Sequence, residues 1–106
     1  MNIDHANHFY MLVDGKPVAT SDIGEWGKWM SENTRAVAKT SVDGADVSTV
    51  FLGLDHSFRF GATPILFETM IFGGPHDEYQ ERYATLEEAM KGHERAVAIA
   101  KGEVVP

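Results

Sequence analysis

Two Asp-Gly pairs constrain the fold of this chain more than any other sequence feature. Asp14-Gly15 separates the extended runs HFYMLV and KPVAT, and Asp43-Gly44 separates RAVAKTSV from ADVSTVFLGLD. A two-residue turn of type I′ needs positive φ at both central positions, which Asp-Gly tolerates. The sequence therefore predicts two β-hairpins. Pro17 cannot donate to a strand ladder, so the second arm of the first hairpin should be short and lie at an edge.

The second hairpin leads into strands that are apolar on both sides. Its two-residue turn sets a register in which Val37 pairs with Val50. The next apolar run, ILFETMIF at residues 65–72, is interrupted by Glu68 and a threonine. Strands without a polar face lie inside a sheet, so we place residues 46–54 at its centre.

A helix is predicted between the hairpins, in SDIGEWGKWMSEN. Asp22 is a suitable N-cap, and Glu25 follows it at the spacing of a reciprocal capping partner. Gly24 and Gly27 each weaken a helix by about 1 kcal/mol relative to Ala. Close packing of the glycine side on the sheet is the simplest compensation.

The C-terminal third adds an edge strand and a second helix. In residues 79–83, Tyr and Glu alternate with Gln and Arg, as in an exposed edge strand. Thr85-Leu-Glu-Glu88 is a capping box, and Gly102 marks the end of the helix that it opens. The order ββ-α-ββββ-α predicts an α+β domain in two layers. We expect an antiparallel sheet of about five to six strands with two helices on one face.

Composition limits the class of protein. The 106 residues suit a single domain, in which we expect residues 1–7 to be flexible. The chain has no cysteine, so it has neither disulfides nor thiolate metal ligands. No apolar run approaches the ~20 residues of a membrane helix, and MNIDHANHF has no signal pattern. These features predict a cytoplasmic protein without a cofactor.

The chain is acidic, with a formal net charge of −7. Binding to a nucleic-acid backbone draws on Lys and Arg, so we expect none. Acids concentrate between Gly74 and Glu88, with Arg82 as the opposing charge; they are Asp77, Glu78, Glu81, Glu87 and Glu88. Such a surface attracts a basic protein groove, whereas on its plainer interpretation it is a solvated face.

Asp55-His56 ends the predicted central strand. A carboxylate beside an imidazole can orient a general base. Adjacent strand residues point to opposite faces, however, which keeps the two side chains apart. We therefore favour a turn-capping role for Asp55, with His56 at the edge of the core. The alternative is a small metal-assisted hydrolase that uses Asp55, His56, Glu68 and His76.

Histidines offer little support for a metal site. His5 and His8 lie near the N-terminus, and His93 and Glu94 diverge on a helix. No helical His-Glu-x-x-His pattern is present. We predict no metal site.

Glu68 lies where one face of its strand should be buried. If this side chain faces the helices, it must be paired or protonated, and it becomes a candidate acid. If its face is the open one, Glu68 is an ordinary surface charge. In that case Leu66, Met70 and Phe72 form an exposed apolar patch, which usually marks an interface.

The loop HSFRFGATP contains Phe58, Arg59 and Phe60. Aromatic residues together with Arg are typical of interaction hot spots, and aromatic rings stack on nucleotide bases. The alternative is that both rings pack under the loop as a small satellite core.

The stretches VSTVFLGLDHSF, LFETMIFGGP and YATLEEAMKGHERAV resemble a family of small proteins encoded by bacteriophages and prophages. The resemblance extends from the Asp14-Gly15 turn to the C-terminal helix. It implies no particular activity and no catalytic residue. It does imply a small phage protein made in the bacterial cytoplasm, and such proteins act most often by binding a host component.

We therefore expect a non-enzymatic, homodimeric protein that inhibits or sequesters a host target, as counter-defence proteins do. Its partner is either a host protein at the acidic surface or a small anionic ligand near Arg59. The residues predicted to bind are His56, Phe58, Arg59, Phe60, Glu68, His76, Asp77, Glu78 and Glu81. A metal-assisted hydrolase and a phage assembly protein are the alternatives.

Overall fold

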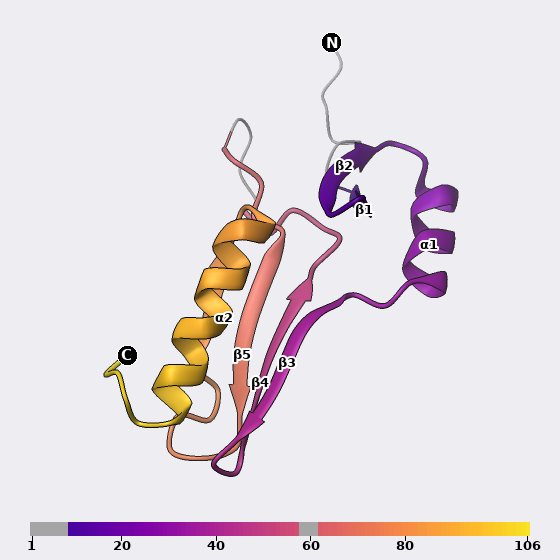
Figure 1. Cartoon of the computed structure of the whole chain (residues 1–106). Coiled ribbons are helices and arrows are strands. Elements are labelled where there is room, and N and C mark those ends of the chain that lie inside the picture. The colour runs from indigo at the N-terminus through magenta and orange to yellow at the C-terminus, as the bar shows by residue number, and fades with distance from the viewer. Residues whose placement is uncertain (1–8, 58–61) are drawn as a thin grey trace.

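A computed structural model describes residues 9–57 and 62–106 of the chain (Figure 1). Its elements are β1 (Phe9–Val13), β2 (Lys16–Thr20), α1 (Ile23–Glu32), β3 (Ala36–Val42), β4 (Ala45–Phe51), β5 (Phe67–Phe72), β6 (Gln80–Tyr83) and α2 (Leu86–Ala100). The predicted α+β class and the order ββ-α-ββββ-α are confirmed.

The strands form two antiparallel sheets, whereas the sequence pattern indicated a single one. β1 and β2 make a two-stranded sheet, and the other four strands are ordered β3-β4-β5-β6. The division occurs at Gly53, where a φ of +77° turns the chain out of the larger sheet. Just beyond that sheet, Tyr10 N donates to Gly53 O (2.9 Å), and Phe9 forms a bridge with Leu54.

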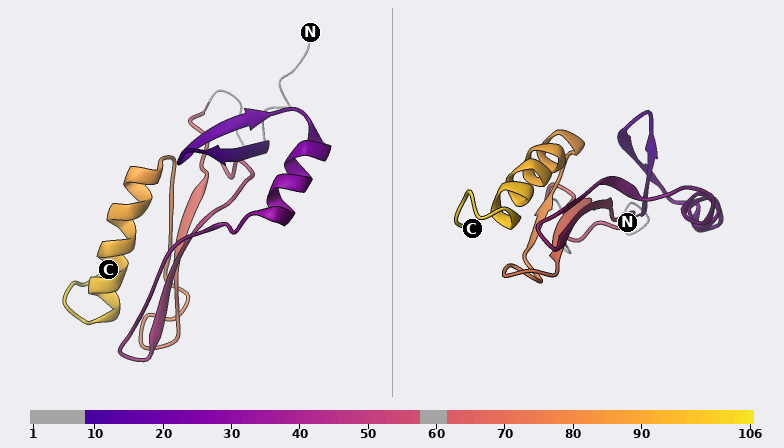
Figure 2. Two further views of the ribbon diagram at one scale, coloured as in Figure 1. Left: turned by 45° about the vertical axis from the view of Figure 1, so that its right-hand side comes forward. Right: turned by 60° about the horizontal axis from the view of Figure 1, so that its bottom comes forward.

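The two helices do not cover one face of the four-stranded sheet together, so this part of the expected arrangement is wrong. α2 packs along this sheet and contacts all of its strands. α1 lies beside the β1–β2 hairpin, at the end of the sheet and away from α2 (Figures 1 and 2). Gly53 also holds α1 in this position, because its carbonyl oxygen accepts a hydrogen bond from Trp26 Nε1 of α1 (3.1 Å). A Cβ atom at this glycine would lie 2.8 Å from the Met30 sulfur.

The glycines within α1 do not pack on the sheet. Gly24 and Gly27 are both exposed, and a Cβ atom at Gly27 would meet no atom within 4 Å. The expected compensation is therefore wrong. The helix is instead held by its N-cap, Asp22, which accepts from Glu25 N (2.9 Å), and by the packing of Trp29 against Phe51 with ring centroids 5.8 Å apart.

Both hairpin turns are confirmed. Asp14 and Asp43 have φ values of 52° and 50°, and a glycine with positive φ follows each of them. The register of the second hairpin holds near its turn but shifts farther along, where Ala36, and not Val37, pairs with Val50. Val37 is the extra residue of a β-bulge and packs against the core. Its predicted pairing is therefore wrong.

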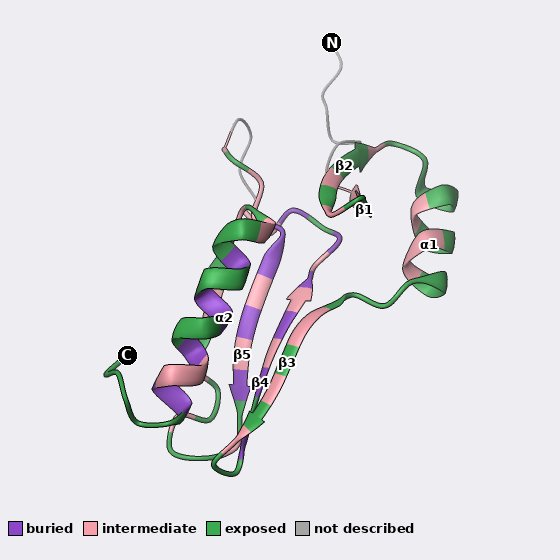
Figure 3. Ribbon diagram, in the orientation of Figure 1, coloured by how far each residue is buried: buried purple, intermediate pink, exposed green. Residues whose placement is uncertain are grey.

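The core lies between α2 and the four-stranded sheet, and Figure 3 shows it as the buried inner sides of β4, β5 and α2. It consists of two apolar clusters. Buried residues of the first are Ala45, Val47, Ile71, Ala96, Ile99 and Ala100. Those of the second are Phe51, Leu66, Phe67, Tyr83 and Ala89. The capping box that opens α2 is confirmed. Neither of the two helices is long and apolar enough to cross a membrane.

Candidate functional site

A row of polar side chains separates the two apolar clusters. Thr49 of β4 and Thr69 of β5 are directly opposite each other, and both are fully buried beneath α2. Their hydroxyl oxygens are 2.6 Å apart. Glu81 of β6 continues the row, because it pairs with Thr69 on the other side. Polar groups thus cross three adjacent strands at the level where α2 covers them.

His93 connects α2 to this row. The residue is 6% exposed, and its ring has Nδ1 2.7 Å from Thr49 Oγ1 and Nε2 2.9 Å from Thr40 Oγ1. Burial lowers the pKa of His93, and the neighbouring Glu94 opposes this effect in part. Burial thus favours the neutral imidazole, in which one nitrogen donates and the other accepts.

Glu81 ends the row at the outer strand. Its Oε1 accepts from Tyr79 Oη (3.3 Å), from Tyr83 Oη (3.1 Å) and from Arg95 Nη2 (2.5 Å). Burial by itself raises the pKa of Glu81, but the hydrogen bonds from Arg95 and Tyr83 outweigh it and hold the pKa below its ordinary value. Burial also raises the pKa of Tyr83 to about 12, with a further contribution from the Glu81 carboxylate.

These contacts form one hydrogen-bond network, which we call the interface network. Its members are Thr40, Thr49, Thr69, Glu81, Tyr83, His93 and Arg95. An ionised carboxylate only accepts, so the Tyr83 hydroxyl donates to Glu81, and it also interacts with Thr69. The Thr49 hydroxyl lies within hydrogen-bond distance of Thr69 Oγ1 and of His93 Nδ1. Because Nδ1 of His93 faces Thr49 and Nε2 faces Thr40, the ring is hydrogen-bonded to two neighbouring strands.

Gly92 makes room for the network beneath α2. A Cβ atom at this position would lie 2.0 Å from Tyr83 Oη and 2.2 Å from Cζ of the same ring. Only glycine lets the tyrosine hydroxyl reach Thr69 and Glu81 under the helix. This close approach couples the position of α2 to that of β6.

A cleft of about 600 Å³ opens beside the network, between the outer edge of β6 and the flank of α2. Its lining residues are Thr63, Ile65, Glu81, Arg82, Tyr83, Ala84, Glu88, Lys91 and Arg95. Glu81, Tyr83 and Arg95 thus belong to both the network and the cleft. A cleft lined by groups with shifted pKa values is a candidate binding site.

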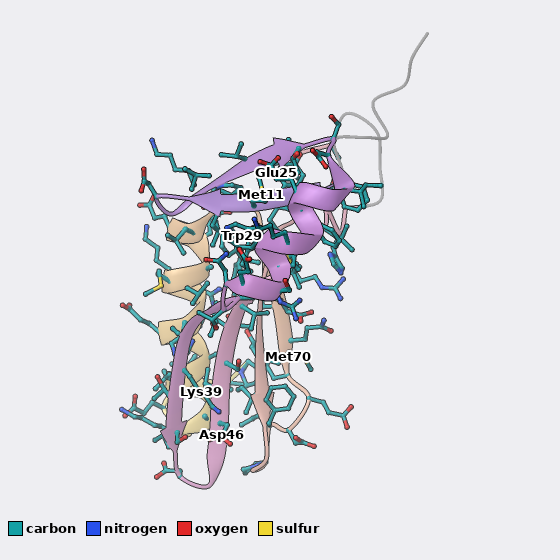
Figure 4. All side chains as sticks on the ribbon, turned by 90° about the vertical axis from the view of Figure 1, so that its right-hand side faces the viewer. Met11, Glu25, Trp29, Lys39, Asp46 and Met70 are labelled. Carbon is teal, nitrogen blue, oxygen red and sulfur yellow. The ribbon has the colours of Figure 1, made fainter. Side chains whose placement is uncertain are left out.

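The opposite face of the four-stranded sheet carries Glu68. We call it the open face and define it by the side chains that point away from α2: Lys39, Ser41, Asp46, Ser48, Val50, Glu68, Met70, Phe72, Gln80 and Arg82. Figure 4 shows this face toward the viewer, with Lys39, Asp46 and Met70 on it and α2 behind.

Glu68 is a paired charge on this open face, and its side chain is only 14% exposed. Its carboxylate accepts from Arg82 Nε (3.0 Å) and from the side-chain amide of Gln80. Of the apolar residues expected beside it, Phe72 is 50% exposed and Met70 is half-buried, whereas Leu66 is buried in the core. The apolar patch therefore consists of Met70 and Phe72, with Val50 on the neighbouring strand.

Asp55 has the turn-capping role that we favoured. Its Oδ1 accepts from Ser57 N (2.8 Å) and from Ile65 N (3.0 Å). The carboxylate therefore connects the two ends of the loop that precedes β5. His56 Nδ1 donates to Leu54 O (2.8 Å). Asp55 is buried and His56 is half-buried. The predicted binding residues Phe58, Arg59 and Phe60 lie outside the described residues, as do His5 and His8.

The four residues of the hydrolase hypothesis come from different ends of the sheet. Asp55 and His56 follow β4, whereas His76 follows the far end of β5, which is roughly 17 Å long at the usual rise per strand residue. Glu68 lies between them on the open face. Within residues 9–57 and 62–106, no three His, Asp or Glu side chains are grouped as a metal site would require.

The acidic segment is divided between the two ends of β6. Asp77 and Glu78 precede the strand, and Asp77 Oδ1 accepts from Gly73 N (2.7 Å) within the turn. Glu87 and Glu88 follow the strand: Glu87 lies 3.7 Å from the Lys91 ammonium, and Glu88 caps α2. With Glu81 under α2, most of these acids have a local structural partner.

Sequence reasoning named Glu81 but missed most of the interface network. A signal was present, since VSTVF and FETMIF are apolar strands that are each interrupted by an inward-facing threonine. Comparison of the chain with protein-family models, with curated proteins and with solved structures finds no match. The functional assignment therefore rests on the geometry of the interface network, the cleft and the open face.

Proposed function

We propose that the protein is a non-catalytic binding protein of phage type that docks on a host protein through its open face and inhibits or sequesters it. The observation that supports this proposal best is the exposed Phe72 beside Met70, on a sheet face opposite the helix that forms the core. Exposed apolar residues with charged groups around them are typical of an interface.

The charges of the open face fit a protein partner. Lys39 and Asp46 are exposed at separate positions, while Glu68 and Arg82 neutralise each other. The face therefore has an apolar centre with isolated charges of both signs around it. Such a pattern gives specificity for a complementary protein surface and has little attraction for a polyanion.

The titratable side chains give further support, because many of them serve the scaffold. Asp55 closes a loop, Glu88 caps a helix and His93 is buried in the interface network. A general base needs a side chain within reach of a substrate. These groups are instead occupied by the protein's own backbone and hydroxyls, which favours recognition over turnover.

The phage context comes from the sequence resemblance alone. It suggests a counter-defence protein that acts in the cytoplasm of the host bacterium. A homodimer is the competing use of the open face, since a second copy can cover Met70 and Phe72 as well as a host protein can. Measuring the molar mass of the purified protein by light scattering separates the two.

The test compares three baits in affinity capture from a bacterial lysate: the wild-type protein, the double variant Met70→Glu/Phe72→Glu and the control Val105→Glu. Val105 is 89% exposed and lies beyond α2, far along the chain from the open face. We expect the wild type and the control to retain the same host protein and the double variant to lose it. Identical captured sets from all three baits would contradict docking at the open face.

A further inference from the structure

We propose that the cleft beside β6 binds an extended, acidic peptide segment, which adds to the four-stranded sheet as a fifth strand. This surface shares only Arg82 with the open face, so the inference goes beyond the proposed function. It rests on the free edge of β6, on the helix flank above it and on the hydrogen-bond donors that line the cleft.

β6 is the outer strand of the sheet, and its register shows which backbone groups point outward. Ile71 N donates to Tyr79 O (3.1 Å), which identifies these two as a hydrogen-bonded pair. Bonding alternates along an antiparallel ladder, so residues 81 and 83 also face β5. Gln80 and Arg82 consequently direct their N–H and C=O groups away from the sheet. These are the groups that an added strand pairs with.

The cleft lies along this edge. Four consecutive residues, 81–84, line it, as expected where a pocket follows the backbone of an edge strand rather than one side-chain face. Glu88, Lys91 and Arg95 form its other wall and share one flank of α2. A groove between an edge strand and a helix holds a peptide in the extended conformation, with backbone hydrogen bonds on one side and side-chain contacts on the other.

The charges of the cleft favour an acidic occupant. Its two carboxylates are already engaged, because Glu81 accepts three hydrogen bonds and Glu88 accepts from Ala84 N and Thr85 N. Its cations retain donor capacity. The Lys91 side chain is 73% exposed. The Arg95 guanidinium has five N–H donors, and its contact with Glu81 is made by Nη2.

Strand geometry sets the pattern of the peptide. Alternate side chains of an added strand point to the same side, so every second residue faces α2. We therefore expect Asp or Glu at positions i and i+2, opposite Lys91 and Arg95. The intervening residues point to the side of the open face and are less restricted.

The experiment starts with selection of random 12-residue peptides displayed on phage particles against the immobilised protein. The most enriched sequence is synthesised with a fluorophore, and its Kd is measured by anisotropy. We expect enriched peptides with alternating acids. Absence of enrichment over an unrelated protein, or enrichment of basic or helix-forming sequences, overturns the proposal.

Two variants of Arg82 test the backbone contact. Arg82→Ala and Arg82→Pro remove the same side chain, but only proline also removes the outward N–H, at an edge position where proline is tolerated. We expect the peptide to bind Arg82→Pro about tenfold more weakly than Arg82→Ala, because a peptide carbonyl loses its donor. Equal affinities for two variants that melt at similar temperatures overturn strand addition.

A second pair keeps the test decisive if Arg82→Pro does not fold. Lys91→Glu reverses a charge in the cleft, and Lys101→Glu makes the same change after the end of α2. We expect about tenfold weaker binding for Lys91→Glu than for Lys101→Glu, since the former places like charges together. Equal effects overturn the acidic preference.

The Met70→Glu/Phe72→Glu variant should bind the peptide as the wild type does. Loss of peptide binding in that variant would instead move the peptide to the open face.

Discussion

The two faces of the four-stranded sheet are made by the same strands yet have opposite properties. On β4 and β5, the side chains of Val47, Phe51 and Ile71 point toward α2 and are fully buried. Their neighbours Met70 and Phe72 point the other way and contact solvent. Side chains alternate along a strand, so one stretch of sequence supplies both a core and a recognition surface. The comparison shows that stability and binding are encoded at alternate positions.

Polar side chains also have different surroundings on the two faces of the sheet. Under α2, the hydroxyls of Thr49 and Thr69 are fully buried and bonded to one another. Across residues 9–57 and 62–106, no buried side-chain nitrogen or oxygen lacks a partner. On the open face, Glu68 pairs with Arg82, whose side chain is 42% exposed. A lost partner in the core leaves a desolvated group behind, whereas a lost partner at the surface is replaced by water.

The largest effect is expected for Gly92→Ala. The added methyl group overlaps the Tyr83 ring, so either the ring or α2 must move, and we expect a loss of about 3 kcal/mol in the free energy of unfolding. The matched control is Gly27→Ala in α1, which meets no atom and should stabilise by about 1 kcal/mol. Urea denaturation followed by circular dichroism gives both values. Similar results for the two glycines would show that the interface tolerates a shift of the helix.

Thr49→Val is expected to cost about 2 kcal/mol, because it leaves Nδ1 of His93 and the Thr69 hydroxyl without their buried partner. Ser48→Val, at the adjacent position on the open face, should stay within about 0.5 kcal/mol of the wild type. The same denaturation measurement applies. Equal costs at these neighbours would remove the distinction between the faces.

Acidification should destabilise the protein through His93. Its pKa is lowered in the folded state, so as the pH falls through the ordinary histidine pKa of about 6.5 the unfolded state takes up a proton more readily than the folded state does. The free energy of unfolding therefore decreases as the pH decreases, until the pH reaches the pKa of His93 in the folded state. His93→Gln should flatten this slope, while His56 and His76 remain in both proteins as an internal control. An unchanged slope would mean that the buried imidazole does not dominate this range.

The smallest effect is expected for Glu68→Gln. It removes the charge opposite Arg82 on the open face but keeps an oxygen that accepts hydrogen bonds, and we expect a change of about 1 kcal/mol or less. The counterpart under α2 is Glu81→Gln, which weakens a contact with Arg95 and two phenols and should cost more. A larger cost for Glu68→Gln than for Glu81→Gln would reverse the ranking of the faces.

Local signals in the sequence predicted local structure well. Asp14-Gly15 and Asp43-Gly44 form their turns, and Thr85 forms its capping box, because each depends on residues next to it in the chain. The bulge at Val37 was not predictable, since it follows from packing against a core built by distant segments. The position of α1 depends on Gly53, whose effect is exerted on residues far away in sequence.

The candidate site depends even more on distant residues. Thr40, Thr49, Thr69 and Tyr83 come from four different strands, and His93 joins them from a helix. Periodicity can show that each residue faces inward. It cannot show that their hydroxyls meet, because that requires the register of every strand pair. Asp55 was easier to interpret, since an Asp side chain at a strand end commonly accepts from the amide two residues on.

The left-handed turn at Gly53 also leads us to expect two parts of the molecule with different dynamics. Residues 9–32 attach to the rest through the bridge at Leu54, through two hydrogen bonds to Gly53 O, and through the packing of Tyr10, Leu12 and Trp29 at one end of the core. No side chain of α1 is fully buried. The N-terminal hairpin and α1 can therefore open as a separate cooperative unit while β4 and β5 stay closed. Amide hydrogen exchange would then be fast throughout residues 9–32 and slow around Thr49 and Thr69, so that the molecule loses its N-terminal third before its sheet.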